Sequence, residues 1–147
     1  FQPGRADPAP LRAGGETFAP TVCYEDAYGS EQLALVRQSS LLVNVTNDAW
    51  FGDSTAPHQH LDISRMRALE SGRAMLRATN DGVTALIGHD GSLLGTLPQF
   101  QPGVLTGEVQ PRTGLTPYVR FGNWPILAVL WLGLAVIVVS YRRSIRR

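Results

Sequence analysis

The sequence predicts a layered α/β domain that is followed by one membrane-spanning helix. Strand-like and helix-like segments alternate over the first half of the chain, and two short apolar segments then flank a tight-turn signal. Near the end of the chain lies a long apolar run without charge. Alternating strands and helices are typical of layered α/β folds, and an apolar run of this length is typical of a membrane span.

The first segments predict a strand, a helix and a second strand. Residues 17–24 contain β-branched residues, and residues 30–38 are rich in good helix formers. Residues 41–46 are mostly apolar, and we expect a strand that is buried on both faces. The polar composition of residues 47–57 predicts a loop.

The longest predicted helix covers residues 60–79. Met66, Leu69 and Leu76 recur there at helical spacing, and the Asn-Asp-Gly sequence that follows predicts its end. Four arginines are expected to form a solvated or salt-bridged face of this helix: Arg65, Arg67, Arg73 and Arg77.

A β meander is predicted after this helix. Residues 83–88 and 92–97 flank an Asp-Gly pair, which is a strong signal for a tight turn between strands. A further strand is expected at residues 104–109 and a polar loop at residues 110–122. The hairpin makes the predicted sheet mixed rather than purely parallel.

The apolar run at residues 124–141 contains no charged residue. As a helix its 18 residues cover about 27 Å, close to the hydrocarbon thickness of a bilayer. Trp124 and Tyr141 stand at its ends, where aromatic residues mark membrane interfaces. A buried core helix is the alternative, but such helices are usually shorter and amphipathic.

The basic residues around the apolar run predict an orientation. Four arginines follow it, namely Arg142, Arg143, Arg146 and Arg147, whereas Arg112 and Arg120 precede it. By the positive-inside rule the tail at 143–147 is cytoplasmic and the domain at 1–123 lies on the outer, periplasmic face, with residues 124–142 as the transmembrane helix. The Pro- and Gly-rich first residues lack a signal peptide, and we expect them to be a loop from a longer chain.

Composition excludes some classes of function. The formal net charge is only +1, so an electrostatic preference for nucleic acid is not expected. The thirteen basic residues are all arginine. One cysteine, Cys23, leaves no intrachain disulfide.

Cys23 lies where an apolar strand gives way to a polar turn, a position that suits a nucleophile. A buried structural cysteine is the alternative. Glu25 and Asp26 follow closely and disfavour a thiolate, so a reactive Cys23 needs a nearby cation or base. The chain has no lysine, and its three histidines have no obvious spacing relation to Cys23. Either Cys23 is inert or its partners lie in another part of the protein.

His58, His60 and Asp62 suggest a metal site at first sight. Helix positions i and i+2 point apart, and no second cluster of ligands is present in the sequence, so no metal and no cofactor is expected.

Several motifs in the same order resemble the apolipoprotein N-acyltransferase family of the nitrilase superfamily. They are VCYED at 22–26, TNDAWFG at 46–52, His60 with MRALE through Glu70, TNDG at 79–82, TGLTPY at 113–118 and FGNWP at 121–125. The resemblance covers nearly the whole chain, and NDAWFG together with MRALE is its most specific part.

The resemblance implies the second half of a nitrilase-like α-β-β-α sandwich followed by one C-terminal transmembrane helix. It also implies a Glu-Lys-Cys triad in which Cys23 is the nucleophile, while the Glu and the Lys belong to a missing N-terminal half. In the implied reaction Cys23 takes an acyl chain from a membrane phospholipid and passes it to the N-terminal amine of a diacylated apolipoprotein. The implied location is the bacterial inner membrane.

Four further residues match family positions near the nucleophile. Tyr24 and Glu25 are expected to shape the site, although Glu25 suits a turn or cap equally well. Trp50 and Phe51 either anchor their own loop in the core or line the acyl-chain entrance near the bilayer surface. Two other functions remain open, a membrane-tethered amidase of the nitrilase type and a non-catalytic membrane-anchored binding domain.

Overall fold

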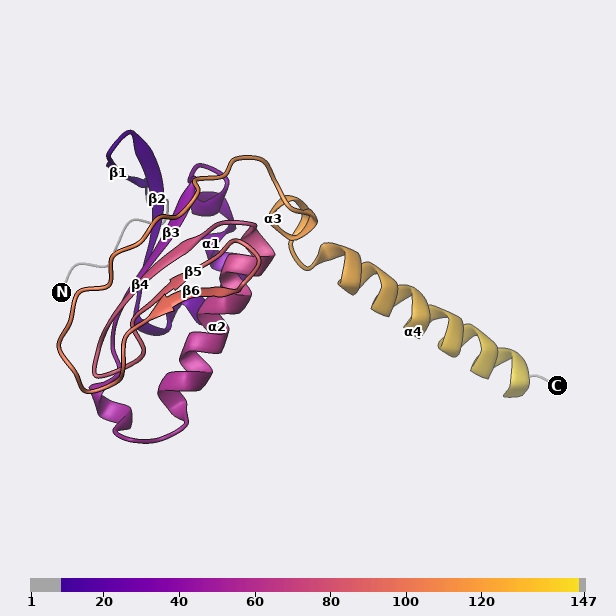
Figure 1. Ribbon diagram of the computed structural model, residues 1–147. Helices are drawn as coiled ribbons and strands as arrows, with labels where there is room; N and C mark the ends of the chain where they lie inside the picture. Colours follow the sequence, from indigo (N-terminus) through magenta and orange to yellow (C-terminus); the bar gives the residue numbers. More distant parts are fainter. Residues whose placement is uncertain (1–8, 146–147) are drawn as a thin grey trace, which may run out of the picture.

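A computed structural model describes residues 9–145 of the chain (Figure 1). One six-stranded mixed sheet has its strands in sequence order, from β1 to β6. The strands are β1 Leu11–Ala13, β2 Glu16–Val22, β3 Leu41–Asn47, β4 Met75–Asn80, β5 Ala85–Ile87 and β6 Leu93–Thr96. The helices are η1 Cys23–Ala27, α1 Gly29–Val36, η2 Ala49–Phe51, α2 Ala56–Ser71, α3 Pro117–Phe121 and α4 Trp124–Ile145. The predicted mixed α/β fold is therefore confirmed.

The centre of the sheet is parallel and its margins are antiparallel. β3 pairs in parallel with β2 and β4, whereas β1, β5 and β6 pair antiparallel with their neighbours. The carboxyl ends of β2, β3 and β4 consequently meet at one edge. Cys23, Asp48 and Asp81 are the first residues beyond these three ends. In open α/β sheets this is the edge where ligands usually bind.

The hydrophobic core lies between the sheet and its helices, which cover one face (Figure 1). The buried cluster draws on the sheet, α1, α2 and α3, and its residues include Ala19, Leu35, Val36, Leu42, Leu61, Ala68, Met75, Ile87 and Val119. Successive side chains of a strand point to opposite faces, so the alternate residues point away from these helices.

The opposite face of the sheet is apolar and has no helix over it within residues 9–145. The segment after β6 runs along this side (Figure 1), and Val104 and Leu105 line a pocket there with Val43 and Leu76. Val45 on the same face is 46% exposed. The expectation that residues 41–46 are buried on both faces is therefore wrong for the described part of the chain.

The predicted helix at residues 60–79 is two elements. Helix α2 ends at Ser71 because Gly72 adopts a left-handed conformation, with φ of 63°, and its N–H caps the carbonyls of Ala68 and Leu69. Residues 75–80 then form β4, which pairs along β3 from Met75 to Asn80. Ala, Met, Leu and Arg favour a helix locally, but the parallel pairing overrides this preference.

Two smaller expectations at the C-terminal side also need correction. Residues 104–109 do not pair as a strand, and the predicted loop at 110–122 contains the short helix α3. Thr116 caps α3, because its hydroxyl accepts a hydrogen bond from the Val119 N–H at 3.1 Å. Val119 lies in the core at 1% exposure, so α3 fastens the linker to the domain.

Helix α4 extends away from the sheet and makes no buried contact with it (Figure 1). Its 22 residues are long and apolar enough to cross a membrane by length and composition. The helix includes the predicted run at 124–141 and continues to Ile145. Of the predicted basic tail at 143–147, Arg146 and Arg147 lie outside the described residues.

Candidate active site

Cys23 begins the turn η1 directly after strand β2 and is partly exposed. Its φ is 53°, in the left-handed region that residues other than glycine rarely adopt. Such a conformation costs about 1 kcal/mol or more and persists only where the surroundings impose it. A side chain displayed on a strained turn between a strand and a helix is the geometry of a nucleophile elbow.

Two hydrogen bonds hold the backbone around Cys23. The Glu25 carboxylate accepts from the Val22 N–H at 2.7 Å, and the Asn44 amide donates to the Cys23 carbonyl at 3.1 Å. The same amide donates to the Thr21 hydroxyl at 3.0 Å. Glu25 thus stabilises the turn in the way that a capping residue does.

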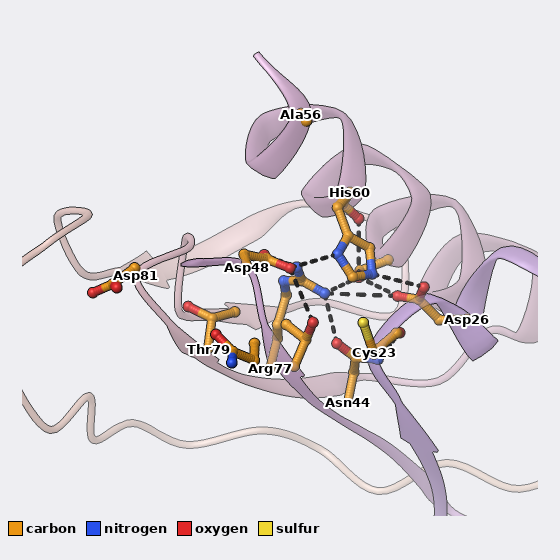
Figure 2. Close-up of polar contacts among 12 residues, drawn as sticks. Cys23, Asp26, Asn44, Asp48, Ala56, His60, Arg77, Thr79 and Asp81 are labelled. Atoms are coloured by element: carbon orange, nitrogen blue, oxygen red, sulfur yellow. Dashed lines mark hydrogen bonds and ion pairs between the residues drawn. The ribbon is translucent and has the colours of Figure 1, made fainter. Parts of the chain in front are cut away.

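Four buried ionisable side chains lie beneath this turn, each from a different element (Figure 2). Asp26 belongs to η1, Asp48 follows β3, His60 lies on α2 and Arg77 on β4. His60 contacts Asp26 through Nε2 at 3.1 Å and Asp48 through Nδ1 at 3.0 Å. Arg77 donates to Asp48 at 3.0 Å. We call these four residues the buried charge network.

Two neutral side chains, Ser64 and Asn44, make hydrogen bonds to the buried charge network. Ser64 donates to Asp26 at 2.5 Å and accepts from Arg77 at 2.8 Å. Arg77 also donates to the Asn44 side-chain oxygen at 2.6 Å. Asn44 holds the Cys23 carbonyl, so Arg77 is linked to the Cys23 turn through Asn44 of β3. Asp26 is part of that turn, because it belongs to η1.

The charges of the network balance. Burial opposes protonation of His60, but its hydrogen bond to Asp26 and its other contacts with the two carboxylates outweigh burial, so the pKa of His60 is raised. Burial lowers the pKa of Arg77, and Asp48 and Asp26 oppose this change by favouring the charged guanidinium. Two carboxylates thus face two cations, which is how buried charges are tolerated.

The sequence did not reveal this network. Arg77 and Arg73, expected on a solvated helix face, are 2% and 3% exposed, and Arg77 lies on a strand. Arg67 does lie on helix α2 and pairs with Glu70 at 2.8 Å, in agreement with the predicted salt-bridged face. His60 is 34 residues from Asp26 in the chain, so spacing alone carried no signal of their contact.

The other predicted site residues lie at the same edge of the sheet. The ring of Tyr24 lies 5.2 Å from the His60 ring, between centroids. Trp50 is 85% exposed and Phe51 is 40% exposed, so among residues 9–145 neither is a core anchor of its loop. Gly82, of the TNDG motif, packs so closely on the Asp48 carboxylate that a Cβ would collide with it.

The described residues provide a thiol without a proton acceptor beside it. No hydrogen bond joins the Cys23 sulfur to another side chain within residues 9–145, and Asp26 is already paired with His60. Across the same span no group of three His, Cys, Asp or Glu side chains gathers as metal ligands. Of the two histidines considered for a metal, His58 is exposed and His60 is buried.

Comparison with known proteins identifies relatives for nearly the whole chain. The model of the carbon-nitrogen hydrolase family matches residues 2–118. The apolipoprotein N-acyltransferase of Azotobacter vinelandii is 52% identical over 139 residues, which are 93% of this chain and 27% of the relative. The Ralstonia nicotianae protein of the same name is 49% identical over 98% of this chain and 28% of its own length. The chain therefore spans about a quarter of these relatives.

Solved structures show the same fold. An amidase from Nesterenkonia is 29% identical, with a TM-score of 0.56 over 70% of this chain and 41% of the amidase. In a mutant of that amidase, 26% identical with a TM-score of 0.55 over 70% of this chain and 41% of its own, the acetamide moiety of fluoroacetamide is covalently bound at the active-site cysteine. A carbon-nitrogen hydrolase from Helicobacter pylori, 14% identical with a TM-score of 0.57, covers 66% of this chain and 41% of its own and shares the fold.

Proposed function

This chain belongs to the carbon-nitrogen hydrolase family, and from that premise we propose that it is the C-terminal part of an apolipoprotein N-acyltransferase with Cys23 as its nucleophile. The identity of about 50% with relatives of that name, over more than nine tenths of the chain, carries the assignment. The strained turn at Cys23 supports the choice of nucleophile, because residues in such conformations cluster at active sites.

The proposed reaction has two steps and a covalent intermediate. The Cys23 sulfur attacks the ester carbonyl of a membrane phospholipid, a C–S bond forms, and the C–O ester bond breaks to release a lysophospholipid, which takes up the thiol proton. The N-terminal amine of the S-diacylglyceryl-cysteine then attacks the thioester. A C–N bond forms, the C–S bond breaks, and the amine proton returns to the sulfur. Alternating donor and acceptor give ping-pong kinetics.

The groups that move these protons are proposed to come from the missing N-terminal half. A Glu there would act as general base and a Lys would stabilise the oxyanion. This chain contains no lysine, and its histidine nearest to the turn is engaged with two carboxylates. Cys23 is therefore expected to be inactive in this part of the protein alone.

The surroundings of Cys23 suit a lipid substrate. We propose that Tyr24 and Glu25 shape the site and that Trp50 and Phe51 line the acyl-chain entrance. The exposure of Trp50, at 85%, supports this role, because an indole favours the interface of a bilayer. Helix α4 is proposed to span the bacterial inner membrane, with the catalytic domain in the periplasm and the basic tail in the cytoplasm.

Acyl labelling of the full-length enzyme tests the proposal. Incubation with a phospholipid labelled in its acyl chains should leave a hydroxylamine-sensitive label on the peptide that contains Cys23, and a diacylated lipoprotein peptide should remove it. The variant Cys23→Ser should lose lipoprotein acylation. Full complementation by Cys23→Ser would instead favour the non-catalytic binding domain.

An amidase that uses water as acceptor is the second candidate, and the fold shared with the Nesterenkonia amidase favours it. The same labelling experiment separates the two functions. An amidase should form no acyl-enzyme with phospholipid but should release ammonia from small amides, and this release should depend on Cys23.

A further inference from the structure

The buried charge network joins the turn of Cys23 to three other elements of the domain (Figure 2). We propose that His60 is a positioning residue, which as an imidazolium holds Asp26, and with it the Cys23 turn, against helix α2 and strand β4. This inference rests on the proposed function only in that acyl transfer is one of its readouts.

The protonated state of His60 follows from its contacts. Both ring nitrogens lie within hydrogen-bond distance of carboxylate oxygens, Nε2 of Asp26 and Nδ1 of Asp48. Carboxylates only accept hydrogen bonds, and a neutral imidazole has a single N–H. Both contacts therefore require an imidazolium. The imidazolium and Arg77 together neutralise the two buried carboxylates, which would otherwise be an uncompensated charge.

The link from His60 to Cys23 is short. Asp26 is the one buried residue of the five-residue turn that Cys23 begins, and it accepts from Ser64 as well as from His60. The Cys23 carbonyl is held from the other side by Asn44, which Arg77 orients. The left-handed backbone of Cys23 is therefore fixed at both ends, and loss of the Asp26 contact frees one of them.

The groups around His60 predict how this device responds to pH. Asp26 and the ring of Tyr24 face it from η1, Asp48 from the end of β3, and Arg77 contacts both carboxylates from β4. Loss of the imidazolium proton, as the pH rises through the raised pKa of His60, removes one N–H, so one carboxylate loses its contact. The turn then loosens, and the reaction of Cys23 slows.

The test uses the full-length enzyme with the variants His60→Gln and His58→Gln. His58 lies two residues away on the same helix and is exposed, so it is the matched control. Two rates are measured over pH: acyl transfer from phospholipid, and alkylation of the Cys23 peptide by iodoacetamide. Alkylation needs no lipid chemistry, so it judges His60 even if acyl transfer is absent and the proposed function fails.

We expect His60→Gln to lower kcat by about 10- to 100-fold while KM stays within about twofold, because a small misplacement of a reacting group costs rate rather than binding. The acyl-transfer rate of the parent enzyme should fall as the pH rises through the folded pKa of His60, and this fall should be absent in His60→Gln and present in His58→Gln. Alkylation rises with pH in every form as the thiolate forms, but the shape of its pH profile should change in His60→Gln and stay as in the parent in His58→Gln. Rates and pH profiles in His60→Gln that match those of His58→Gln would overturn the inference. A lower kcat with an unchanged pH profile would overturn it too.

A second variant serves if His60→Gln fails to fold. Ser64→Ala removes one hydrogen bond to Asp26 but leaves every charge of the network in place. It also removes the acceptor of one Arg77 hydrogen bond. We expect kcat to fall by about 3- to 10-fold at constant KM, because a neutral hydrogen bond contributes about 1 kcal/mol. A Ser64→Ala enzyme with the parent kcat would show that Asp26 does not position the turn.

Discussion

The two faces of the sheet differ in how complete they are. On the face toward the helices, even charged groups such as Arg77 and Asp48 find their partners within this chain. On the other face, apolar residues such as Val45 remain exposed within residues 9–145, and a single irregular segment crosses the strands. A layered domain buries both faces of its sheet, so we propose that a second layer, from outside this chain, covers the exposed face.

This difference bears on which face of the sheet another part of the protein covers. The chain spans about a quarter of the curated relatives and 41% of the solved amidases. We propose that a part of the protein outside this chain packs a second sheet on the exposed face, as the sandwich implied by the resemblance requires. The site of Cys23 lies at an edge of the sheet, where both halves can reach it.

The largest change in stability is expected on the face toward the helices. In the full-length protein Arg77→Met should lower the free energy of unfolding by about 3–5 kcal/mol, because Asp26 and Asp48 would keep a buried charge without its partner. Urea unfolding followed by tryptophan fluorescence measures the change. The exposed Arg12→Met is the control, and equal stability of the two variants would contradict the compensation described above.

The variant Val45→Asp tests whether the exposed face of the sheet is covered in the full-length protein. Val45 is 46% exposed here, so a carboxylate at this position would be tolerated if the face stayed open. We expect the full-length protein to lose about 2–3 kcal/mol instead, because a second layer would bury the charge. Val45→Thr controls for shape. Unchanged stability of Val45→Asp would remove the reason to place a layer on this face.

The third effect is the pH dependence of stability that His60 confers on the face toward the helices. The folded state raises the pKa of His60, so the folded state binds its proton more tightly than the unfolded chain. This stabilisation is fully present below about pH 6.5, the ordinary value for histidine, and is lost as the pH rises through the folded pKa. Melting temperatures across this range should fall in the parent more than in His60→Gln.

The smallest effect is expected at the exposed ion pair of α2. Arg65 and Asp62 are 2.9 Å apart, but their side chains are 43% and 67% exposed. Asp62→Asn should change stability by about 0.5 kcal/mol or less, because water and salt screen such pairs. A loss as large as that of Arg77→Met would show that burial is not what separates the two pairs.

Local patterns in the sequence predicted the elements that depend on local interactions. The strand before Cys23, the helix at α1 and the hairpin around the Asp-Gly pair were predictable from composition and turn chemistry. Strand β4 was not, because its residues favour a helix and only pairing with β3 makes them a strand. Gly72 was the available signal, since a glycine after an apolar helical pattern often ends the helix.

The candidate site divides in the same way. The position of Cys23 at a strand end was predictable, because the change from apolar to polar residues is local. The roles of His60 and Arg77 were not, because their partners lie 34 and 29 residues away and meet only after the sheet has formed. Because residues 75–80 were predicted as helix rather than strand, Arg77 was also predicted to face solvent, whereas it is buried.

At position 23 the backbone conformation favours glycine, whereas the proposed reaction requires a cysteine. Glycine is the residue that adopts a φ of 53° most easily, and a glycine here would relax the turn by about 1 kcal/mol. It would also remove the sulfur. The residue that would stabilise this turn most therefore has no nucleophile. A stability measurement alone cannot show whether a substitution at Cys23 is tolerated.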